Sequence, residues 1–564
     1  MQNIFTIRRY VALVVAMLAF ATQGAVAQNA DRAKQDFELG RSTEILANIL
    51  REYHTNYVDE VAGDAMLKSA VDGLVRATDP YSEYLSEESM AAFEMLTTGK
   101  YGGVGSLIRK RGDYVIFAQP YKGAPSDEAG VKIGDKILAI DGEDMKGAAT
   151  ETISSRLKGD PGTEVSVTIE RNIGGGVDTL QLKRRRISVP SVPYAGYVAD
   201  GIGYIVHNDF IEGSYDEMRR ALQRLQAEGE LKGLILDYRT NGGGLMQEAV
   251  DIASLFVPNG ERIVSIMGRD SSSLHHYDTR HQPLAENLPV AILVSGSSAS
   301  ASEILAGALQ DKDRAVLLGQ RTFGKGLVQG TRHLGYGTYL KYTTAKYYIP
   351  SGRCIQAVNY SKRNADGSVA SVPDSLISEF KTRGGRSVYD GGGIVPDVRI
   401  EPQYVSRFAL TLYAMGYMED WVDGYMRRNH NREIDVRTFS ITDEDYADFC
   451  RYIEEKDVPY ESETRRALKS LERAADADRY DERLAEVLKS LDEMVKDDKM
   501  SNMETYRPEI LEALNGEIVL RYAYSEGVCE YLAVRDSSVM RAVELLRDTA
   551  EYRRILGEQH LPMH

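Results

Sequence analysis

Short aliphatic runs alternate with stretches of helical spacing over residues 203–319 of this 564-residue chain. The runs are rich in Val, Ile and Leu, as is typical of buried strands. The predicted strands are 203–207, 233–237, 289–294 and 315–319, the predicted helices are 215–228, 246–256 and 302–310, and a strand pair is predicted over 338–349. This alternation constrains the segment to a layered α/β domain.

Composition places the chain among ordinary globular proteins, with 43% apolar residues, 27% charged residues and 50 Gly against 16 Pro. A chain of this length is expected to form about three or four domains. The formal charge of −16 argues against a nucleic-acid partner and against a general affinity for anionic lipid surfaces. Three Cys residues cannot supply a disulfide framework, so the core must hold the fold together.

Residues 1–27 have the pattern of a cleaved export signal. Arg8 and Arg9 precede the apolar run Tyr10–Phe20, and the sequence AVA at 25–27 supplies the small residues that a signal peptidase accepts. The alternative is a retained membrane anchor, but the run has about half of the roughly 20 apolar residues that a spanning helix needs. We therefore expect an exported mature chain, periplasmic or otherwise extracytoplasmic, soluble and without a membrane span.

Changes in hydrophobic periodicity and glycine content divide the rest of the chain into four segments. Two helices are predicted between Asp36 and Arg76, short β-branched runs between Gly clusters begin near Thr97, and charged helices with few Gly follow Pro402. The predicted segments are helical 28–95, β-rich 96–187, α/β 188–403 and helical 404–564. Apolar residues from Leu484 to Val495 form a stripe along one helix face, which we interpret as domain core.

Ser300 lies in the turn between a predicted buried strand and the helix that carries Ile304 and Leu305. At such a turn, peptide N–H groups and the positive end of the helix dipole favour developing negative charge, which suits a nucleophilic hydroxyl. Ser300 and Glu303 also fit the S-x-x-E capping box. Taken alone, this fragment therefore favours a structural cap.

Lys325 stands between Gly324 and Gly326, just after a predicted strand. Flanking Gly residues permit close approach of other backbone. A Lys with its ordinary pKa near 10.4 is no base at neutral pH, but desolvation disfavours its charged form, and Ser-Lys enzymes activate a hydroxyl in this way. In isolation a solvated Lys in a turn remains the alternative.

Three consecutive Gly residues, Gly242 to Gly244, follow Asn241 at the end of another predicted strand. Peptide N–H groups in such a segment are unobstructed by side chains, as an oxyanion hole requires. A phosphate nest or a tight turn are the alternatives. The segment lacks the Lys-Ser/Thr ending of a P-loop, so nucleotide binding is disfavoured.

Together these segments resemble the C-terminal processing (tail-specific) serine peptidases, and the match spans about residues 40–402. One block alone would be a weak signal, whereas eight blocks in the same order make coincidence implausible. The blocks are Asp79-Pro80-Tyr81-Ser82, Tyr101–Gly105, Gly134-Asp135, Asn241–Gly244, Ser298–Glu303, Phe323–Gly326, Lys346–Arg353 and Gly392–Asp397.

The resemblance implies that Ser300 is the nucleophile and Lys325 the general base, with Gln329 orienting Lys325. Gln329 lies four residues beyond Lys325, so the two share a face if that segment is helical. The implied oxyanion donors are the N–H groups of Gly244, Gly243 and Ala301. Neither a metal nor a cofactor is expected.

The β-rich segment 96–187 resembles a PDZ domain. Tyr101–Gly105 would cup a chain-terminal carboxylate in backbone N–H groups, and Ser106–Arg109 would add the peptide as an extra strand. Val104 and Leu107 would meet an apolar terminal side chain, although both could instead belong to the core. The predicted peptide contacts are Tyr101, Gly102, Gly103, Val104, Gly105, Ser106 and Leu107.

The fold implied by the resemblance is a crotonase/ClpP-like mixed α/β protease core (28–95 and 188–403) with an inserted PDZ domain and an all-α C-terminal extension. The implied function is an exported serine endopeptidase that recognises apolar C-terminal tails of proteins or peptides and cleaves or degrades them. The alternative is a catalytically silent peptide-binding scaffold or chaperone of the same fold. Helices 404–564 would close a substrate tunnel, form a homo-oligomer or bind an adaptor.

Overall fold

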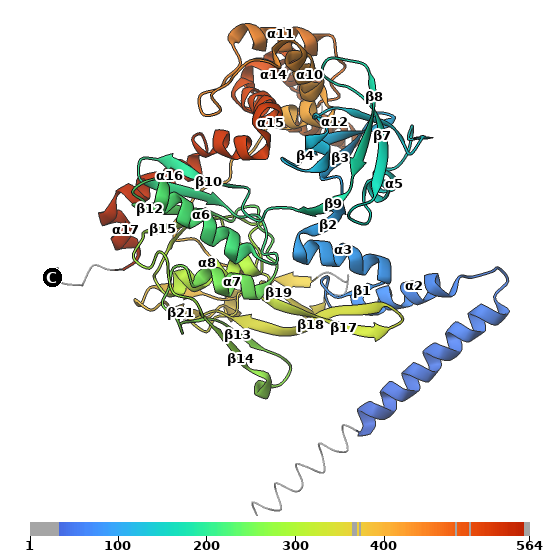
Figure 1. Cartoon of the computed structure of the whole chain (residues 1–564), viewed down its shortest axis with the longest axis vertical. Coiled ribbons are helices and arrows are strands. Elements are labelled where there is room, and N and C mark those ends of the chain that lie inside the picture. Colours follow the sequence, from blue (N-terminus) through green and yellow to red (C-terminus); the bar gives the residue numbers. More distant parts are fainter. Residues whose placement is uncertain (1–32, 364–368, 372–373, 480–481, 496–497, 558–564) are drawn as a thin grey trace, which may run out of the picture. The chain divides into compact units, whose positions relative to one another are not determined.

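The computed structural model describes residues 33–363, 369–371, 374–479, 482–495 and 498–557 (Figure 1). The predicted export signal lies outside these residues. Within them, the model contains no helix with both the length and the apolar character that crossing a bilayer requires. The chain forms two compact units: the first comprises the residues up to Glu87 together with Gln329–Thr343, and the second comprises the rest.

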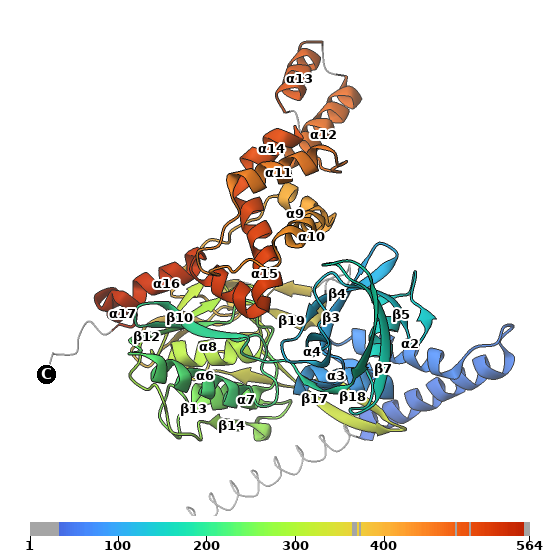
Figure 2. The same ribbon diagram turned by 45° about the horizontal axis from the view of Figure 1, so that its top comes forward.

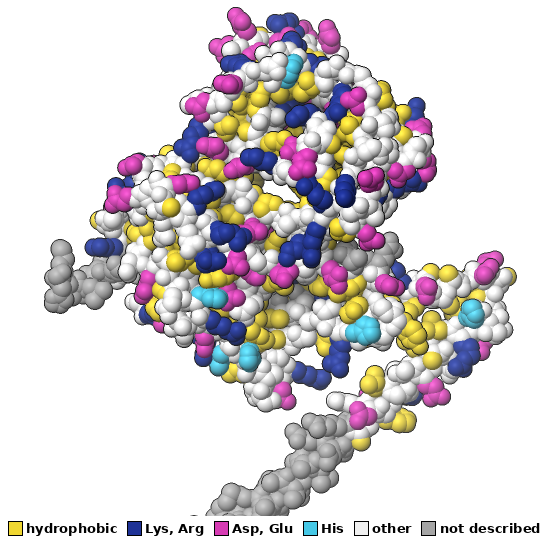
Figure 3. All heavy atoms as spheres, viewed as in Figure 1, with side chains coloured by type: hydrophobic (Ala, Val, Ile, Leu, Met, Phe, Trp, Pro, Cys, Tyr) yellow, Lys and Arg dark blue, Asp and Glu magenta, His cyan; other side chains and the backbone are white. Residues whose placement is uncertain are grey.

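The first unit contains the two helices that the sequence predicts. They are a helix over 33–56 and α2 (Gly63–Arg76), followed by the short strand β1 (Glu83–Leu85). Strand β1 pairs antiparallel with β18 (Thr338–Tyr348), with Glu83 opposite Lys341. Hydrophobic side chains such as Phe37 are exposed along the helix over 33–56, as Figure 3 shows.

The hairpin partner of β18 is β17 (Leu327–Gly335), so the strand pair predicted over 338–349 is wrong: that range is a single strand. The turn lies before it, at Tyr336 and Gly337, whose φ angles are 51° and 70°. Glycine adopts such angles at no steric cost, which allows the chain to reverse there.

The second unit is built around a six-stranded sheet in the order β10-β11-β12-β15-β16-β23. All neighbouring pairs are parallel except β10 with β11. The strands are β10 (Tyr194–Ala199), β11 (Ile202–Val206), β12 (Gly233–Asp237), β15 (Val290–Val294), β16 (Val316–Gly319) and β23 (Val398–Arg399). The four strands predicted between 203 and 319 are therefore neighbours in one sheet.

Helices cover both faces of this sheet, because alternate residues of each strand point to opposite sides (Figures 1 and 2). Leu236 and Ile292 pack in one core with α6 (Ser214–Glu228), α7 (Met246–Ala253) and α8 (Ala301–Asp311). On the other face, Ile235 and Leu293 pack with α16 (Ser537–Arg547) and α17 (Thr549–Ile555). The last helices of the chain thus complete an α/β/α sandwich.

The β-rich segment forms a separate sheet in the order β3-β4-β5-β7-β8. Its buried side chains, among them Phe117 and Val167, form one core with α5 (Thr150–Leu157). The strands are β3 (Ser106–Arg111), β4 (Tyr114–Pro120), β5 (Lys136–Ile140), β7 (Glu164–Glu170) and β8 (Val177–Lys183). Strand β3 lies at the edge of this sheet, so one side of its backbone is open to a further strand.

The C-terminal region beyond Ser406 contains a second helical core, around Trp421 and Phe449. The helices are α9 (Arg407–Ala414), α10 (Tyr417–Asn429), α11 (Asp443–Glu454), α12 (Glu463–Asp478), α13 (Glu482–Met494), α14 (Lys499–Thr505) and α15 (Arg507–Ala533). Helices α12 and α13 project from the others in Figure 2. The stripe predicted as core lies along α13. Leu488 is buried, and Leu484 and Val495 pack against its small core. Val487, Leu491 and Met494 are exposed, so that prediction is wrong for half of the stripe.

Candidate active site

Ser300 lies between the carboxyl end of β15 and the start of α8, as the alternation of strands and helices predicts. Its φ and ψ angles are 57° and −115°, a conformation that non-Gly residues rarely adopt. An ordinary helix-capping Ser has extended backbone angles, so a capping role alone does not account for this geometry. Strained residues of this kind are typical of functional sites, where a sharp turn presents a side chain.

The carboxyl group of Glu303 joins the turn of Ser300 to the turn of Lys325. Its Oε2 accepts hydrogen bonds from the backbone N–H groups of Ser300 and Lys325, both at 2.9 Å. Its Oε1 accepts from the Thr322 hydroxyl at 2.5 Å and from the Gly324 N–H at 2.8 Å. Two residues that are 25 positions apart in the sequence therefore share a single acceptor atom.

Burial of this carboxyl group raises the pKa of Glu303 to about 7, although the four donors favour the charged form. Its side chain is completely buried, so loss of hydration outweighs the hydrogen bonds. Sequence reasoning assigned Glu303 only to a capping box. Its N–H bond from Ser300 belongs to that motif, but nothing in the motif indicates the bonds from the second turn.

Tyr347 on β18 makes a second link between the same two turns. Its hydroxyl lies 3.1 Å from the carbonyl oxygen of Ser300 and also contacts the carbonyl oxygen of Lys325. The side chain is buried, with 1% of its surface exposed. The backbone N–H and C=O groups of both residues are therefore held by the same two side chains, Glu303 and Tyr347.

The glycine segment lies directly against Ser300. A Cβ atom added to Gly243 would be 2.7 Å from the Cβ of Ser300, so no larger residue fits there. The N–H of Gly243 donates to the side-chain oxygen of Asn241 at 2.8 Å, which occupies this predicted oxyanion donor. The same oxygen accepts from the Ser302 hydroxyl at 2.8 Å, so Asn241 fixes the glycine segment to α8.

Gly244 forms a parallel bridge with Phe210. The bonds of this bridge come from its neighbours: Phe210 N–H donates to the Gly243 carbonyl, and Leu245 N–H donates to the Phe210 carbonyl. In such a bridge the N–H of the central residue points to the opposite side. The N–H of Gly244 therefore points away from Phe210.

Gln329 lies on the strand β17, so the helix under which it would share a face with Lys325 is not formed by this segment. Its side-chain amide donates to the Thr343 hydroxyl at 3.3 Å, within the first unit. Ser300, Lys325 and Gly243 all belong to the second unit. The structure thus connects Ser300, Lys325 and Gly243 with one another. The contact that it gives Gln329 is with Thr343.

A narrow groove lies between β3 and α5 in the β-rich domain. It has a volume of about 30 Å³ and is lined by Tyr101, Val104, Gly105, Ser106, Ile108, Ser154, Leu157 and Lys158. Val104 is 3% exposed and also belongs to the domain core, which was the alternative for this residue. Leu107 does not line this groove, whereas Ile108, which sequence reasoning missed, does.

A larger cavity of about 950 Å³ lies where the β-rich domain, the sheet and α15 meet. Leu107 lines it from β3, Ser295 and Ser297 from the Ser300 turn, and Tyr524 from α15. Its rim carries Arg239, which pairs with Asp237 and Asp536, both at 2.6 Å. The cavity therefore borders both the edge strand of the β-rich domain and the turn that carries Ser300.

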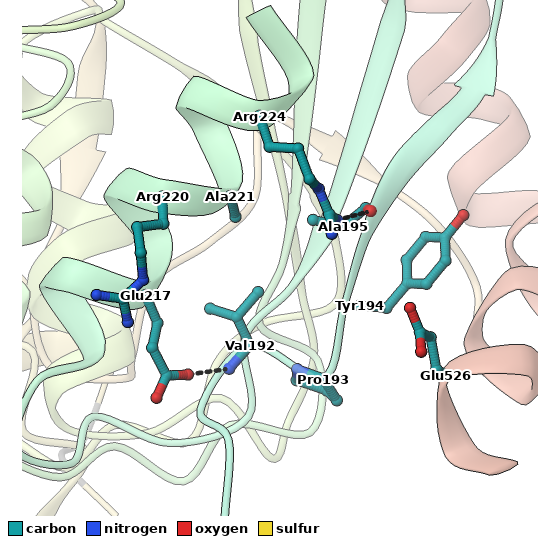
Figure 4. Close-up of a pocket in the computed structure, with 9 residues that line it drawn as sticks. All are labelled: Val192, Pro193, Tyr194, Ala195, Glu217, Arg220, Ala221, Arg224 and Glu526. Atoms are coloured by element: carbon teal, nitrogen blue, oxygen red, sulfur yellow. Dashed lines mark hydrogen bonds between the residues drawn. The ribbon is translucent and has the colours of Figure 1, made fainter. Parts of the chain in front are cut away.

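Another pocket, of about 310 Å³, lies between α6 and β10 and is shown in Figure 4. Two of its polar side chains are paired: Glu217 accepts from the N–H of Val192, and Arg224 donates to the carbonyl of Ala195. Neither Ser300 nor Lys325 lines it. We do not assign the chemistry to this pocket.

Comparisons with known proteins agree with this arrangement. Residues 201–361 match the model of peptidase family S41, residues 116–171 match a PDZ domain, and residues 408–546 match the C-terminal helical domain of probable PDZ-proteases. A probable CtpA-like serine protease of Staphylococcus aureus is 35% identical over 384 residues, which cover 66% of this chain and 72% of the relative. A carboxy-terminal-processing protease of Bartonella bacilliformis is 34% identical over 55% of this chain and 72% of its own length.

Among solved structures, the photosystem II D1 C-terminal processing protease is similar at 28% identity, over 63% of this chain and 87% of that chain, with a TM-score of 0.34. The fold and the matched models define a serine peptidase that carries a PDZ domain. The chain belongs to peptidase family S41, among the carboxy-terminal-processing serine proteases. The family resemblance and the enzyme class predicted from the sequence are confirmed.

Proposed function

We propose that this protein is an exported endopeptidase in which Ser300 is the nucleophile and Lys325 the general base. The observation that carries the proposal is the shared acceptor atom Oε2 of Glu303. It accepts hydrogen bonds from the backbone N–H groups of both residues at 2.9 Å. Tyr347 adds a second link between their carbonyl groups. Two turns held together in this way favour a fixed geometry between hydroxyl and amine, which catalysis requires.

In the proposed reaction, Ser300 Oγ attacks the carbonyl carbon of the scissile peptide while Lys325 Nζ accepts the hydroxyl proton. Lys325 then gives that proton to the leaving amine, and water hydrolyses the acyl-enzyme. Lys325 must be neutral at the first step, so partial burial of its side chain supports the role. Gln329 is proposed to orient Lys325, as the family resemblance implies.

The oxyanion that forms in this reaction is proposed to bind the N–H groups of Gly244 and Ala301. Gly244 is favoured over Gly243, because the N–H of Gly243 already donates to Asn241. Ala301 is the first residue of α8, where N–H groups have no partner within the helix. The positive end of the helix dipole adds to the stabilisation of the negative charge.

The PDZ domain is proposed to select substrates by their apolar C-terminal tails. Strand β3 lies at the edge of its sheet, which leaves its backbone open to an added peptide strand. Gly105 and Ser106 lie at one end of the groove and would receive the terminal carboxylate, and Ile108 and Leu157 would meet the last side chain. Recognition in this mode requires a free C-terminus.

The proposal is tested with a reporter protein that ends in an apolar tail. Ser300→Ala and Lys325→Ala should each abolish its cleavage while leaving the melting temperature close to that of wild type. Lys325→Arg should be inactive too, because a guanidinium keeps the charge but cannot act as a base. Ser297→Ala, in the same turn but exposed, is the matched control and should cleave normally. Turnover by any of the first three variants would refute the assignment.

A further inference from the structure

The outer face of β3 is held by the C-terminal helical region. Arg109 and Arg111 point to the face of β3 opposite to Ile108, since successive residues of a strand alternate. Arg111 donates to Asp423 on α10 at 2.7 Å and also contacts Asp420. Arg109 contacts Glu419 on the same helix. The strand that is proposed to receive substrate tails is therefore tied to α10 by two ion-paired arginines.

Two of the three acidic groups in this cluster are buried, and the arginine side chains approach them from the PDZ domain. The side chains of Asp423 and Glu419 are only 2% and 8% exposed. Within the helical region, Arg521 on α15 contacts Asp423 at 3.0 Å and Glu517 at 2.8 Å. Among the described residues, Arg521 is the cation that would remain beside Glu419 and Asp423 without the PDZ domain. Buried charges that lack partners are costly, so the cluster favours the docked arrangement.

Other contacts flank the cluster on both sides. Arg427 on α10 donates to the carbonyl of Asn172 at 3.0 Å. Tyr524, at a kink in α15 where φ is 56°, donates to Asp127 at 2.5 Å. Figure 2 shows α10 beside β3 and β4. The helical region thus contacts the PDZ domain at several places besides the arginine cluster.

The peptide groove on the other side of β3 is narrow, with a volume of about 30 Å³. A wider groove, with room for a substrate side chain, requires β3 and α5 to move apart. Because β3 forms one wall and its arginines are bound to α10, movement of that wall requires those ion pairs to break.

We propose that α10 and the arginines of β3 form an ionic latch that keeps the PDZ groove narrow and opposes binding of substrate tails. The latch consists of Arg109 and Arg111 on β3 with Glu419, Asp420 and Asp423 on α10. Tail binding and latch formation are then mutually exclusive, so each weakens the other by the same factor. This inference rests on the proposed role of the PDZ domain in tail recognition.

The test uses the whole chain and a fluorescent peptide with an apolar, carboxylate-ending tail. The first variant is the double substitution Arg109→Gln/Arg111→Gln, which removes the charges on the PDZ side of the latch. The second is Asp420→Asn on the helix side, at a half-exposed position where the substitution carries little risk to folding. Both should bind the peptide roughly tenfold more tightly than wild type. Lys136→Gln, which breaks the Lys136–Glu170 pair inside the PDZ domain, is the matched control and should bind as wild type does.

Hydrogen exchange of β3 and α10 supplies a second readout that does not depend on the peptide. Both latch variants should exchange faster at these two elements, and the control should not. Faster exchange with unchanged or weaker peptide affinity would show that the contact does not oppose binding, which overturns the latch. Unchanged exchange would overturn it as well. If no variant and no wild-type sample binds the peptide, the proposed tail recognition fails, and the exchange result alone decides whether the contact is a latch.

Discussion

Glu303 shows how one buried carboxyl group can organise two distant turns. All four of its hydrogen-bond partners are donors, so the ionised form fits the site and a protonated oxygen would lose at least one of them. Glu303 lies in the first turn of α8, where the helix dipole also favours a negative charge. Burial nevertheless raises its pKa to about 7. Proton uptake near neutrality is therefore expected to weaken the link between Ser300 and Lys325.

We expect the free energy of unfolding of Glu303→Gln, measured relative to that of wild type, to increase as the pH rises from 5 to 8. Between its unfolded pKa of 4.5 and its folded pKa of about 7, the folded chain holds a proton that the unfolded chain has lost. Wild-type stability therefore falls as pH rises through this window, by about 3 kcal/mol in total. Gln does not titrate, so the stability of the variant does not fall in this way.

Calorimetry at the two pH values measures this effect as the difference in melting temperature between variant and wild type. Glu212→Gln, which alters an exposed ion pair with Lys100, serves as the control and should show no such change. The account of Glu303 is contradicted if its variant differs from wild type by the same amount at pH 5 and at pH 8.

At the scale of elements, β18 contributes to the site through Tyr347 although it lies outside both turns. The strand pairs with β13 (Arg262–Met267), with Ile266 opposite Tyr347, and this register places the ring against the core. Sequence reasoning found Tyr347 in a family block but assigned it no contact. The register of a strand pair depends on the whole sheet, so a local pattern could not predict it.

Tyr347→Phe is expected to lower kcat by about tenfold or more, because it removes the link between two carbonyl groups and lets the turns shift. The fold should lose only about 1 kcal/mol, the typical contribution of one hydrogen bond. Tyr348→Phe, one residue further along β18, is the control. Steady-state cleavage of the tailed reporter measures kcat and KM separately. Equal kcat values for the two variants would show that the Tyr347 hydroxyl does not position the two turns.

At the scale of the whole molecule, the C-terminal helices have two different environments. Helices α9–α11, α14 and α15 enclose a core of their own, whereas α16 and α17 cover one face of the protease sheet. Asp536 begins α16 by accepting the N–H of Ser538 at 2.8 Å and pairs with Arg239 beside the glycine segment. The range predicted as one helical segment therefore includes helices that belong to the packing of the protease core.

Truncation of the chain after Arg535 is expected to prevent folding of the protease core. It removes Val539, Val543 and Leu546, whose burial contributes about 1.5–3 kcal/mol each, and it exposes the sheet face beneath them. Together these losses approach the whole stability of a typical domain. Solubility and circular dichroism of the purified chain check this. A chain that ends at Gly557 is the control, and a truncated core with wild-type melting behaviour would contradict the prediction.

The sequence by itself determined the family and most of the order of strands and helices, and it supplied the candidate residues for the proposed chemistry. These follow from short-range patterns, since buried strands, helix spacing and glycine turns depend on neighbouring residues. Only the tertiary structure revealed that Glu303 and Tyr347 join the two turns, that half of the α13 stripe is exposed, and that α10 holds β3. Each of these depends on contacts between residues far apart in the chain, which are fixed by how the layers pack and not by any local pattern.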